Sequence, residues 1–585
     1  MFEICKKLLD WIKKSRINRI LIVAIIFSTL FRIYLAIKTP LYAQAGADFD
    51  DYLFVKYALS ILSGGWLGPF DCKTLAKGAS YSVFLAVNYL LGIPYSLALI
   101  LTYITAVILF IIAIRKLISN KYFLLTSYLF LLFSPVMFHI ENVQKIYRGG
   151  LIVSFALIII SAAIGLYTSR NDSRKTQLKW SLLLGFSLSF FWFLKEDSIW
   201  ILPFVLGIIL ITIISSIFQR KKTISRIFIS IIPIILLFSS ILLYNYTNYK
   251  FYGEFTITDR SGTYFKEFIA DILQIEDDEN YQNVWITKKM MYKAIDVSPT
   301  LQSIKPYIDD MYKNSWALKE NGEIEGDMIY WIIKEKVSDA GIYDKGGEYV
   351  NKFYQKIDTE LNSAFKTGKL KKSKDKIYLS SMAKGFTINE IRKFNKKETK
   401  SAIDTIITYK ENETSIYEAT GDYNNILNMQ YLTNSTIILP GTGKKKLEFI
   451  NVIINIDTKI VEIYQKTGNL VFAISIMGLI LLVIETIYNF VTKKNNKYYE
   501  IALILICLCS SAAALFIGVE WFCSWFGFFK NRYIYNYTCG IFPILQILES
   551  IGIYILIINI INIFRQITNK YLQRKKNNIK LKQGE

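Results

Sequence analysis

Long runs of apolar residues constrain this chain more than any other feature, because about 20 such residues in a helix are needed to cross about 30 Å of hydrocarbon. About ten runs qualify, at 19–37, 95–114, 122–138, 149–168, 180–194, 198–218, 226–245, 467–491, 500–519 and 539–563. With 585 residues, 52% of them hydrophobic and 20% charged, the chain is neither a single soluble enzyme, a disordered chain nor a disulfide scaffold. The sequence predicts a polytopic α-helical membrane protein.

The positive charge is distributed in a way that predicts orientation. The net charge is +22, from 69 Lys and Arg against 47 Asp and Glu, and the basic segments RKLISNK, SRNDSRK, QRKKTISR, TKKNNK and the C-terminal tail alternate with less basic loops. Cytoplasmic loops of membrane proteins carry such an excess. We expect both termini in the cytoplasm and a multi-pass protein in a bacterial cytoplasmic membrane, with no nucleic-acid partner.

The first run also resembles a signal peptide, because KKSRINR precedes it and Ala43-Gln44-Ala45 follows it. Its length and the presence of Arg32 favour a retained first helix instead. Three units are then predicted: a transmembrane module at 1–245 with a first outer loop at 38–94, a soluble extracytoplasmic domain at 246–466, and C-terminal transmembrane helices with a basic tail at 467–585. The polar middle unit is predicted to be α/β or mainly α.

Cysteine and histidine content excludes several kinds of site. The six cysteines form no metal-binding spacing, although two of Cys72, Cys523 and Cys539 could pair on the outer side. With His139 as the single histidine, a histidine-based metal site and a Ser/His/Asp triad are not expected. We predict no metal site, and a divalent cation is not indicated.

Three carboxylates follow the first helix within four positions: Asp48, Asp50 and Asp51. One interpretation is a helix N-terminus, where acidic side chains cap free amides and oppose the dipole. The other is a general base built from ionisable groups crowded at a membrane surface. A third, the metal-binding Asp-x-Asp of nucleotide-sugar enzymes, does not fit, because those enzymes work on the cytoplasmic side and this loop faces outward.

The rest of the loop resembles the first outer loop of the GT-C glycosyltransferases, in the branch of the protein O-mannosyltransferases and lipid A aminoarabinose transferases. The acidic pair Asp50-Asp51, Ala58, the turn Ser63-Gly64-Gly65-Trp66 and Lys77-Gly78 carry this resemblance. Asp51 stands where the family usually has Glu, and Ala79 where proline is common. The match covers about the first 250 residues and a late Arg532-Tyr533 pair.

The resemblance implies an inverting glycosyltransferase that moves a sugar from a polyprenyl-phosphate donor to an acceptor hydroxyl outside the cell. Asp50 and Asp51 would be catalytic, with Asp50 as the base, and Lys77 would contact the donor phosphate. The acceptor would be an envelope polymer, a lipid or a protein. The soluble domain would handle this acceptor, which we infer from its position alone.

Other charged loop residues gain candidate roles in the same way. In SPVMFHIENVQKIYRGG, which also carries Lys145, Glu141 would assist the acceptor and Arg148 would bind phosphate; the alternatives are solvated charge and interfacial anchoring. His139 is expected to be an interfacial polar residue without a catalytic task.

The segment FLKEDSIWILP carries Lys195, Glu196 and Asp197 and is predicted to be a tight outer turn. Lys195 would contact phosphate and the two acids would be auxiliary, as would Asp48; a plain turn is the alternative. Arg532 is a further candidate phosphate ligand; the alternative is that it anchors the helix end at the membrane interface.

Two other functions remain open. A transporter, or a flippase or polymerase of lipid-linked glycans, would require buried charges or glycine and proline breaks in the spans. A sensor or assembly factor would make no demand on the carboxylates. Neutralising Asp50 distinguishes these possibilities.

Overall fold

The computed structural model describes residues 15–218, 223–279, 281, 283–394, 397–442, 448–492, 498–526 and 529–582. Regular structure in these ranges is almost entirely helical. Their one sheet pairs Lys376–Ile377 (β1) with Phe386–Thr387 (β2) in antiparallel orientation. The middle of the chain is therefore mainly α.

Eight described helices are long and apolar enough to cross a membrane. They are Arg16–Lys38 (α2), Tyr95–Ile114 (α5), Gly149–Thr168 (α8), Leu202–Phe218 (α10, extended by the 3-10 turn η2, Ser198–Ile201), Thr223–Tyr252 (α11), Glu448–Val491 (α22), Tyr499–Cys523 (α23) and Phe542–Lys582 (α25, preceded by η6, Cys539–Ile541).

Two of the ten predicted spans, 122–138 and 180–194, do not meet these criteria. The first forms Lys121–Leu132 (α6), whose 12 residues reach about 18 Å, and Pro135 soon begins a separate 3-10 turn (η1, Pro135–Met137). The second lies in Arg174–Trp192 (α9), where three basic residues occupy the first six positions and shorten the apolar part. By length and composition the described part therefore holds eight candidate spans.

The first outer loop is folded into the molecule. It contains Asp51–Leu62 (α3) and Ser80–Leu90 (α4), which pack against each other. In the turn after α3, Gly64 and Trp66 have positive φ, and the Trp66 indole N–H donates to Asn248 of α11 at 2.7 Å. A small apolar cluster joins this loop to α11 and to Trp331 of the middle segment.

The segment predicted as one domain at 246–466 is divided between two cores. Residues 265–370 build their own apolar core from Tyr264–Gln274 (α13), Lys288–Val297 (α14), Pro299–Gln302 (α15), Lys305–Asn314 (α16), Met328–Asp339 (α17), Tyr343–Lys345 (η3) and Gly347–Lys366 (α18). The short helices Asp259–Gly262 (α12) and Ile388–Phe394 (α19) flank it.

Residues 398–442 belong to the main core instead. Glu398–Thr408 (α20) packs on α22, and Tyr423–Thr433 (α21) packs on α3 and α4. The strand-like segment 41–45 pairs with the same region, since the Ala45 amide donates to the Thr420 carbonyl at 2.7 Å. Helices α11 and α22 run without a break through the predicted boundaries at 245 and 466.

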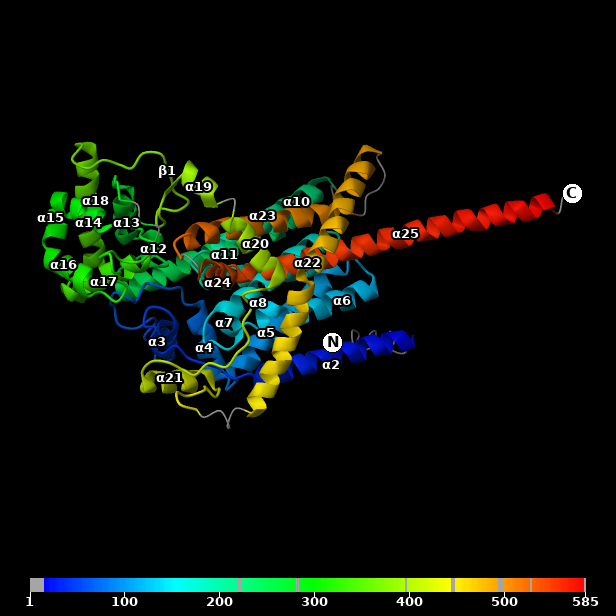
Figure 1. Ribbon diagram of the computed structural model, residues 1–585, viewed down its shortest axis with the longest axis horizontal. Helices are drawn as coiled ribbons and strands as arrows, with labels where there is room; N and C mark the ends of the chain where they lie inside the picture. Colours follow the sequence, from blue (N-terminus) through cyan, green and yellow to red (C-terminus); the bar gives the residue numbers. More distant parts are fainter. Residues whose placement is uncertain are drawn as a thin grey trace.

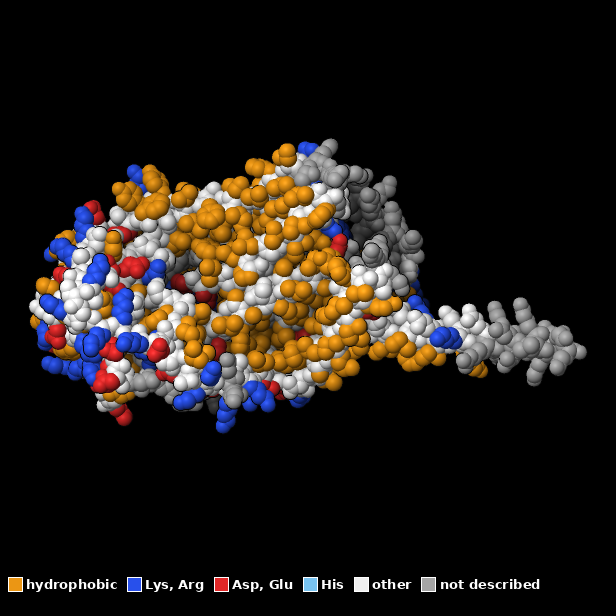
Figure 2. All heavy atoms as spheres, turned by 90° about the horizontal axis from the view of Figure 1, so that it is seen from above, with side chains coloured by type: hydrophobic (Ala, Val, Ile, Leu, Met, Phe, Trp, Pro, Cys, Tyr) orange, Lys and Arg blue, Asp and Glu red, His pale blue; other side chains and the backbone are white. Residues whose placement is uncertain are grey.

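The arrangement in space is polarised. The start of α2 and the end of α25 project in the same direction, and the helices α13–α18 lie at the opposite end (Figure 1). Figure 2 shows a broad apolar surface between a charged end, formed by those helices, and the basic start of the tail. This is the surface expected of helices that face lipid.

Candidate functional site

Asp50 stands directly before α3, but its carboxylate makes no capping hydrogen bond to that helix. Instead, Asp50 Oδ1 lies 3.0 Å from Lys77 Nζ and accepts a hydrogen bond from the Tyr147 hydroxyl at 2.8 Å. Burial opposes ionisation, but Lys77, Arg148 and Lys145 hold the pKa of Asp50 below its usual value. Asp50 is therefore an ionised carboxylate, and its side chain is 44% exposed.

Asp51 turns inward, and its side chain is only 2% exposed. Its Oδ1 lies 3.3 Å from Lys145 Nζ, which in turn lies 3.2 Å from Glu141 Oε2. Burial raises the pKa of Asp51 to about 7. The positive charge of Lys145 opposes this rise, and the negative charge of Asp50 adds to it. The two adjacent carboxylates thus differ in both accessibility and protonation.

Arg148 and Glu196 form a two-point ion pair. Arg148 Nη1 and Nη2 lie 3.1 and 3.0 Å from the two oxygens of Glu196, and Nη1 also donates to the Leu194 carbonyl at 3.0 Å. Burial disfavours the charged form of Glu196, but Arg148 and Lys77 hold the pKa of Glu196 far below its usual value. Since Lys77 acts on both Glu196 and Asp50, the 193–203 turn belongs to the same cluster as the first loop.

The same turn reaches the late part of the chain. Lys195 Nζ lies 2.8 Å from Asp197 Oδ2 and donates to the Tyr537 carbonyl at 3.3 Å. Tyr537 ends the helix Lys530–Tyr537 (α24), which also carries Arg532. The predicted turn and the late Arg-Tyr motif are therefore neighbours.

Arg532 completes a chain of ion pairs. Its Nη2 lies 3.5 Å from Glu141 Oε1 and 3.6 Å from Glu413 Oε2. Because Glu141 also binds Lys145, charged contacts run continuously from Asp51 to Arg532. Arg532 is 40% exposed, whereas Lys77, Arg148 and Lys195 are 11% exposed or less.

Asp48 and Asp50 have different ion-pair partners. Asp48 Oδ2 is 3.1 Å from Lys73 Nζ and 3.8 Å from Lys56 Nζ. The Asp-x-Asp spacing therefore directs the two side chains to different lysines. Among the described residues, no group of three or more His, Cys, Asp or Glu is placed to hold a metal ion.

Four residues of this cluster were not predicted as site residues: Lys145, Tyr147, Glu413 and Asp327. Lys145 had a local signal, because it follows Glu141 by four positions. Asp327 immediately precedes α17, and burial raises its pKa against the charges of Arg260 and Lys77. Its electrostatic interaction with Lys77 depends on the packing of distant segments, which no local pattern encodes.

His139 is fully buried rather than interfacial. Its Nδ1 accepts a hydrogen bond from the Glu413 amide at 3.0 Å, and its Nε2 lies 2.7 Å from Asn536 Oδ1. Burial lowers the pKa of His139, so it is a neutral ring that ties three segments together. The five described cysteines (Cys72, Cys507, Cys509, Cys523 and Cys539) are all free thiols; Cys5 lies outside the described residues.

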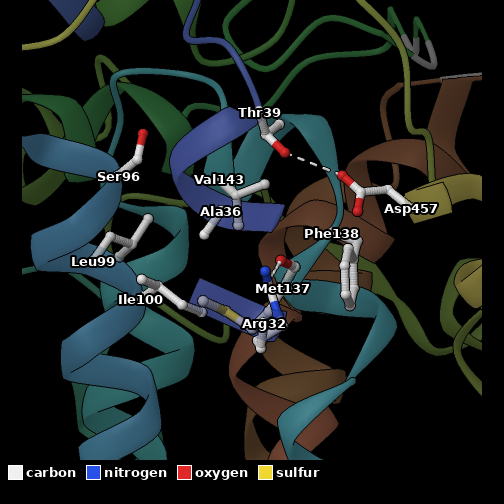
Figure 3. A pocket seen from close by; sticks show the side chains of 10 residues that line it. All are labelled: Arg32, Ala36, Thr39, Ser96, Leu99, Ile100, Met137, Phe138, Val143 and Asp457. Carbon is white, nitrogen blue, oxygen red and sulfur yellow. Dashed lines mark hydrogen bonds between the residues drawn. The ribbon is translucent and has the colours of Figure 1, made fainter. Parts of the chain in front are cut away.

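A separate polar cavity lies between α2, α5 and α22 (Figure 3). Arg32 donates to the Met137 carbonyl at 2.5 Å, and its guanidinium lies 4.0 Å above the Phe138 ring centroid. Across the cavity, Thr39 donates to Asp457 Oδ2 at 3.1 Å. Its volume of about 20 Å³ has room for one water, so this cavity is not a substrate site.

No family model matches the chain, and no curated protein matches it.

Proposed function

We propose that this protein is an inverting glycosyltransferase that uses a polyprenyl-phosphate sugar at the outer face of a bacterial cytoplasmic membrane. One observation carries the proposal: Asp50 is an exposed, ionised carboxylate held by Lys77 and Tyr147 among buried cations, on the loop that follows an apolar helix. Such a group suits a general base that works on a substrate anchored in the bilayer.

The chemistry balances with these groups. The acceptor hydroxyl oxygen attacks the anomeric carbon while its proton passes to Asp50. The bond between that carbon and the phosphate oxygen breaks, and the electron pair leaves with the polyprenyl phosphate. Because the leaving group is a stable anion, it needs stabilising cations rather than an acid.

Lys77, Arg148, Lys195 and Arg532 are the proposed phosphate ligands. Each already has a carboxylate partner, so a phosphate must share or replace that partner. Arg532 is the most exposed of the four and its carboxylate contacts are the longest. We therefore assign it the first contact with the donor phosphate.

The direct test is a membrane assay with a panel of radiolabelled polyprenyl-phosphate hexoses and pentoses. Asp50→Asn should abolish transfer while the protein still inserts and folds. Asp172→Asn is the matched control, since Asp172 pairs with Lys116 beyond the end of α8, whereas Arg148 of the cluster precedes the start of that helix, and it should transfer normally. Full activity of Asp50→Asn would refute the assignment.

A transporter or lipid-linked glycan flippase is the second candidate. It is favoured by buried charges in candidate spans: Arg32 in α2, and Glu549 in α25, whose two oxygens have no hydrogen-bond partner among the described residues. Under this alternative, Glu549→Gln would abolish movement of a fluorescent lipid-linked sugar across proteoliposomes. Asp50→Asn would leave that movement intact.

A further inference from the structure

Three aromatic side chains from two distant segments meet beside Asp50. Phe49, the residue before Asp50, has its ring centroid 4.7 Å from that of Trp331 in α17. It also stacks on Trp316, which lies between α16 and α17, at 6.3 Å with an interplanar angle of 28°. The segment 316–331 thus brings two indoles against Phe49, the residue that precedes the proposed base.

Trp316 is unusual in this group because it is 57% exposed. Its indole N–H donates to Glu335 Oε2 at 3.1 Å, which fixes the orientation of the ring at the surface. Leaving more than half of a large apolar ring in water forgoes part of the free energy that its burial would contribute. An exposed ring that is held in place in this way is preorganised for a ligand.

Charged groups surround the rings and connect them to the proposed site. Lys73 Nζ lies 4.5 Å from the Phe49 ring centroid and pairs with Asp48 at 3.1 Å. Lys77 Nζ lies 5.5 Å from the Trp331 ring centroid and 3.0 Å from Asp50 Oδ1. The same lysine therefore contacts both the aromatic group and the proposed base.

This combination matches the chemistry of a sugar ring. A pyranose has a face of C–H bonds that packs on the electron-rich face of an indole, and an edge of hydroxyls that bonds to carboxylates and ammonium groups. An extended apolar ligand would leave the surrounding charged side chains unused. An ion would leave the exposed face of the Trp316 indole unused.

We propose that Trp316, Phe49 and Trp331 form the acceptor subsite and that the acceptor is a glycan, one sugar of which stacks on Trp316 and presents a hydroxyl toward Asp50. This inference rests on the proposed function for the role of Asp50, but glycan binding itself does not require transfer.

The test is binding of defined probes to the purified full-length protein in detergent. Maltotetraose, cellotetraose, mannotetraose and chitotetraose are titrated against wild type, Trp316→Ala and Tyr307→Ala. Tyr307 is a partly exposed aromatic on α16 and serves as the matched control. We expect at least one probe to bind wild type and Tyr307→Ala alike, and Trp316→Ala about tenfold or more weaker.

Two outcomes overturn the proposal: binding of none of the four probes to wild type, or equal binding by Trp316→Ala. The alternative that Trp316 anchors in lipid is tested with brominated lipids in proteoliposomes. Loss of their fluorescence quenching in Trp316→Phe would place this ring in the bilayer and refute the subsite. If glycan binding depends on Trp316 but no donor is turned over, the proposed function fails while the subsite stands.

Discussion

Asp50 and Asp51 are adjacent in the chain, yet their surroundings separate their acid–base behaviour. Asp50 is half-exposed, pairs with the buried Lys77 and stays ionised, whereas burial brings the pKa of Asp51 to about 7. Ionised Asp51 raises the proton affinity of its neighbour, because a second negative charge favours the protonated form. Asp51 is thus placed to tune the strength of the base without contacting substrate.

The first prediction concerns this tuning. As the pH rises through about 7, Asp51 loses its proton, Asp50 becomes the stronger base, and the rate of sugar transfer should increase. Asp51→Asn, which mimics the protonated form, should be slower and show no such rise. The measurement is kcat/KM against pH for both proteins; a parallel rise in the variant would contradict the role of Asp51.

The second prediction concerns Arg148 and Glu196. Arg148→Met leaves Glu196 without its two-point partner, which should lower the free energy of unfolding by about 2–3 kcal/mol, less than for a fully buried pair because Glu196 is one-third exposed. The double variant Arg148→Met/Glu196→Gln removes that charge and should recover about half of the loss. Thermal unfolding in detergent measures both; no recovery would show that packing, not charge, dominates.

At the scale of elements, the crossing of α22 and α25 depends on small residues. A Cβ built on Gly552 would clash with the Ser475 backbone, and one on Gly478 would clash with Gly552. Without a hydrophobic drive between membrane helices, close backbone approach supplies much of their packing energy. The close approach of α22 and α25 at this crossing therefore requires glycine at positions 478 and 552.

The third prediction follows from that crossing. Gly552→Ala should force the helices apart and lower stability by about 1–3 kcal/mol. Gly518→Ala is the matched control, because a Cβ there meets nothing within 4 Å, and it should be neutral or stabilising by up to about 1 kcal/mol. Melting temperatures of the two purified variants should diverge; equal values would contradict the tight crossing.

Elements also differed in how far the sequence predicted them. The span expected at 122–138 was wrong in extent, because α6 stops three residues before Pro135. The first outer loop was predicted as a unit, but its pairing with residues 420 and 438 was not, since hydrogen bonds between such distant segments leave no periodic signal. The same limit hid the division of 246–466 between two cores.

At the scale of the whole molecule, the polarised arrangement leads to a fourth prediction, about topology. Helices α13–α18 lie opposite the chain ends (Figure 1), so the two regions should face opposite sides of the membrane. Single cysteines introduced as Lys313→Cys in α16 and Lys570→Cys in α25 replace exposed side chains. In a background without native cysteines, a membrane-impermeant maleimide should label the first in intact cells and the second only after permeabilisation; the reverse pattern would invert the assigned topology.

Apolar length and basic flanks are local properties, so the amino-acid sequence alone predicts a helical membrane protein and the position of most candidate spans. Most of the charged residues of the cluster were also predicted from the sequence, since ionisable groups beside apolar runs stand out, but Lys145, Glu413 and Asp327 were not. The folded chain was needed to find that Asp50 pairs with Lys77 and Tyr147 while Asp51 is buried against Lys145, and that Trp316 lies against Phe49. These contacts join segments far apart in the chain, and a carboxylate's ionisation depends on neighbours that only folding supplies.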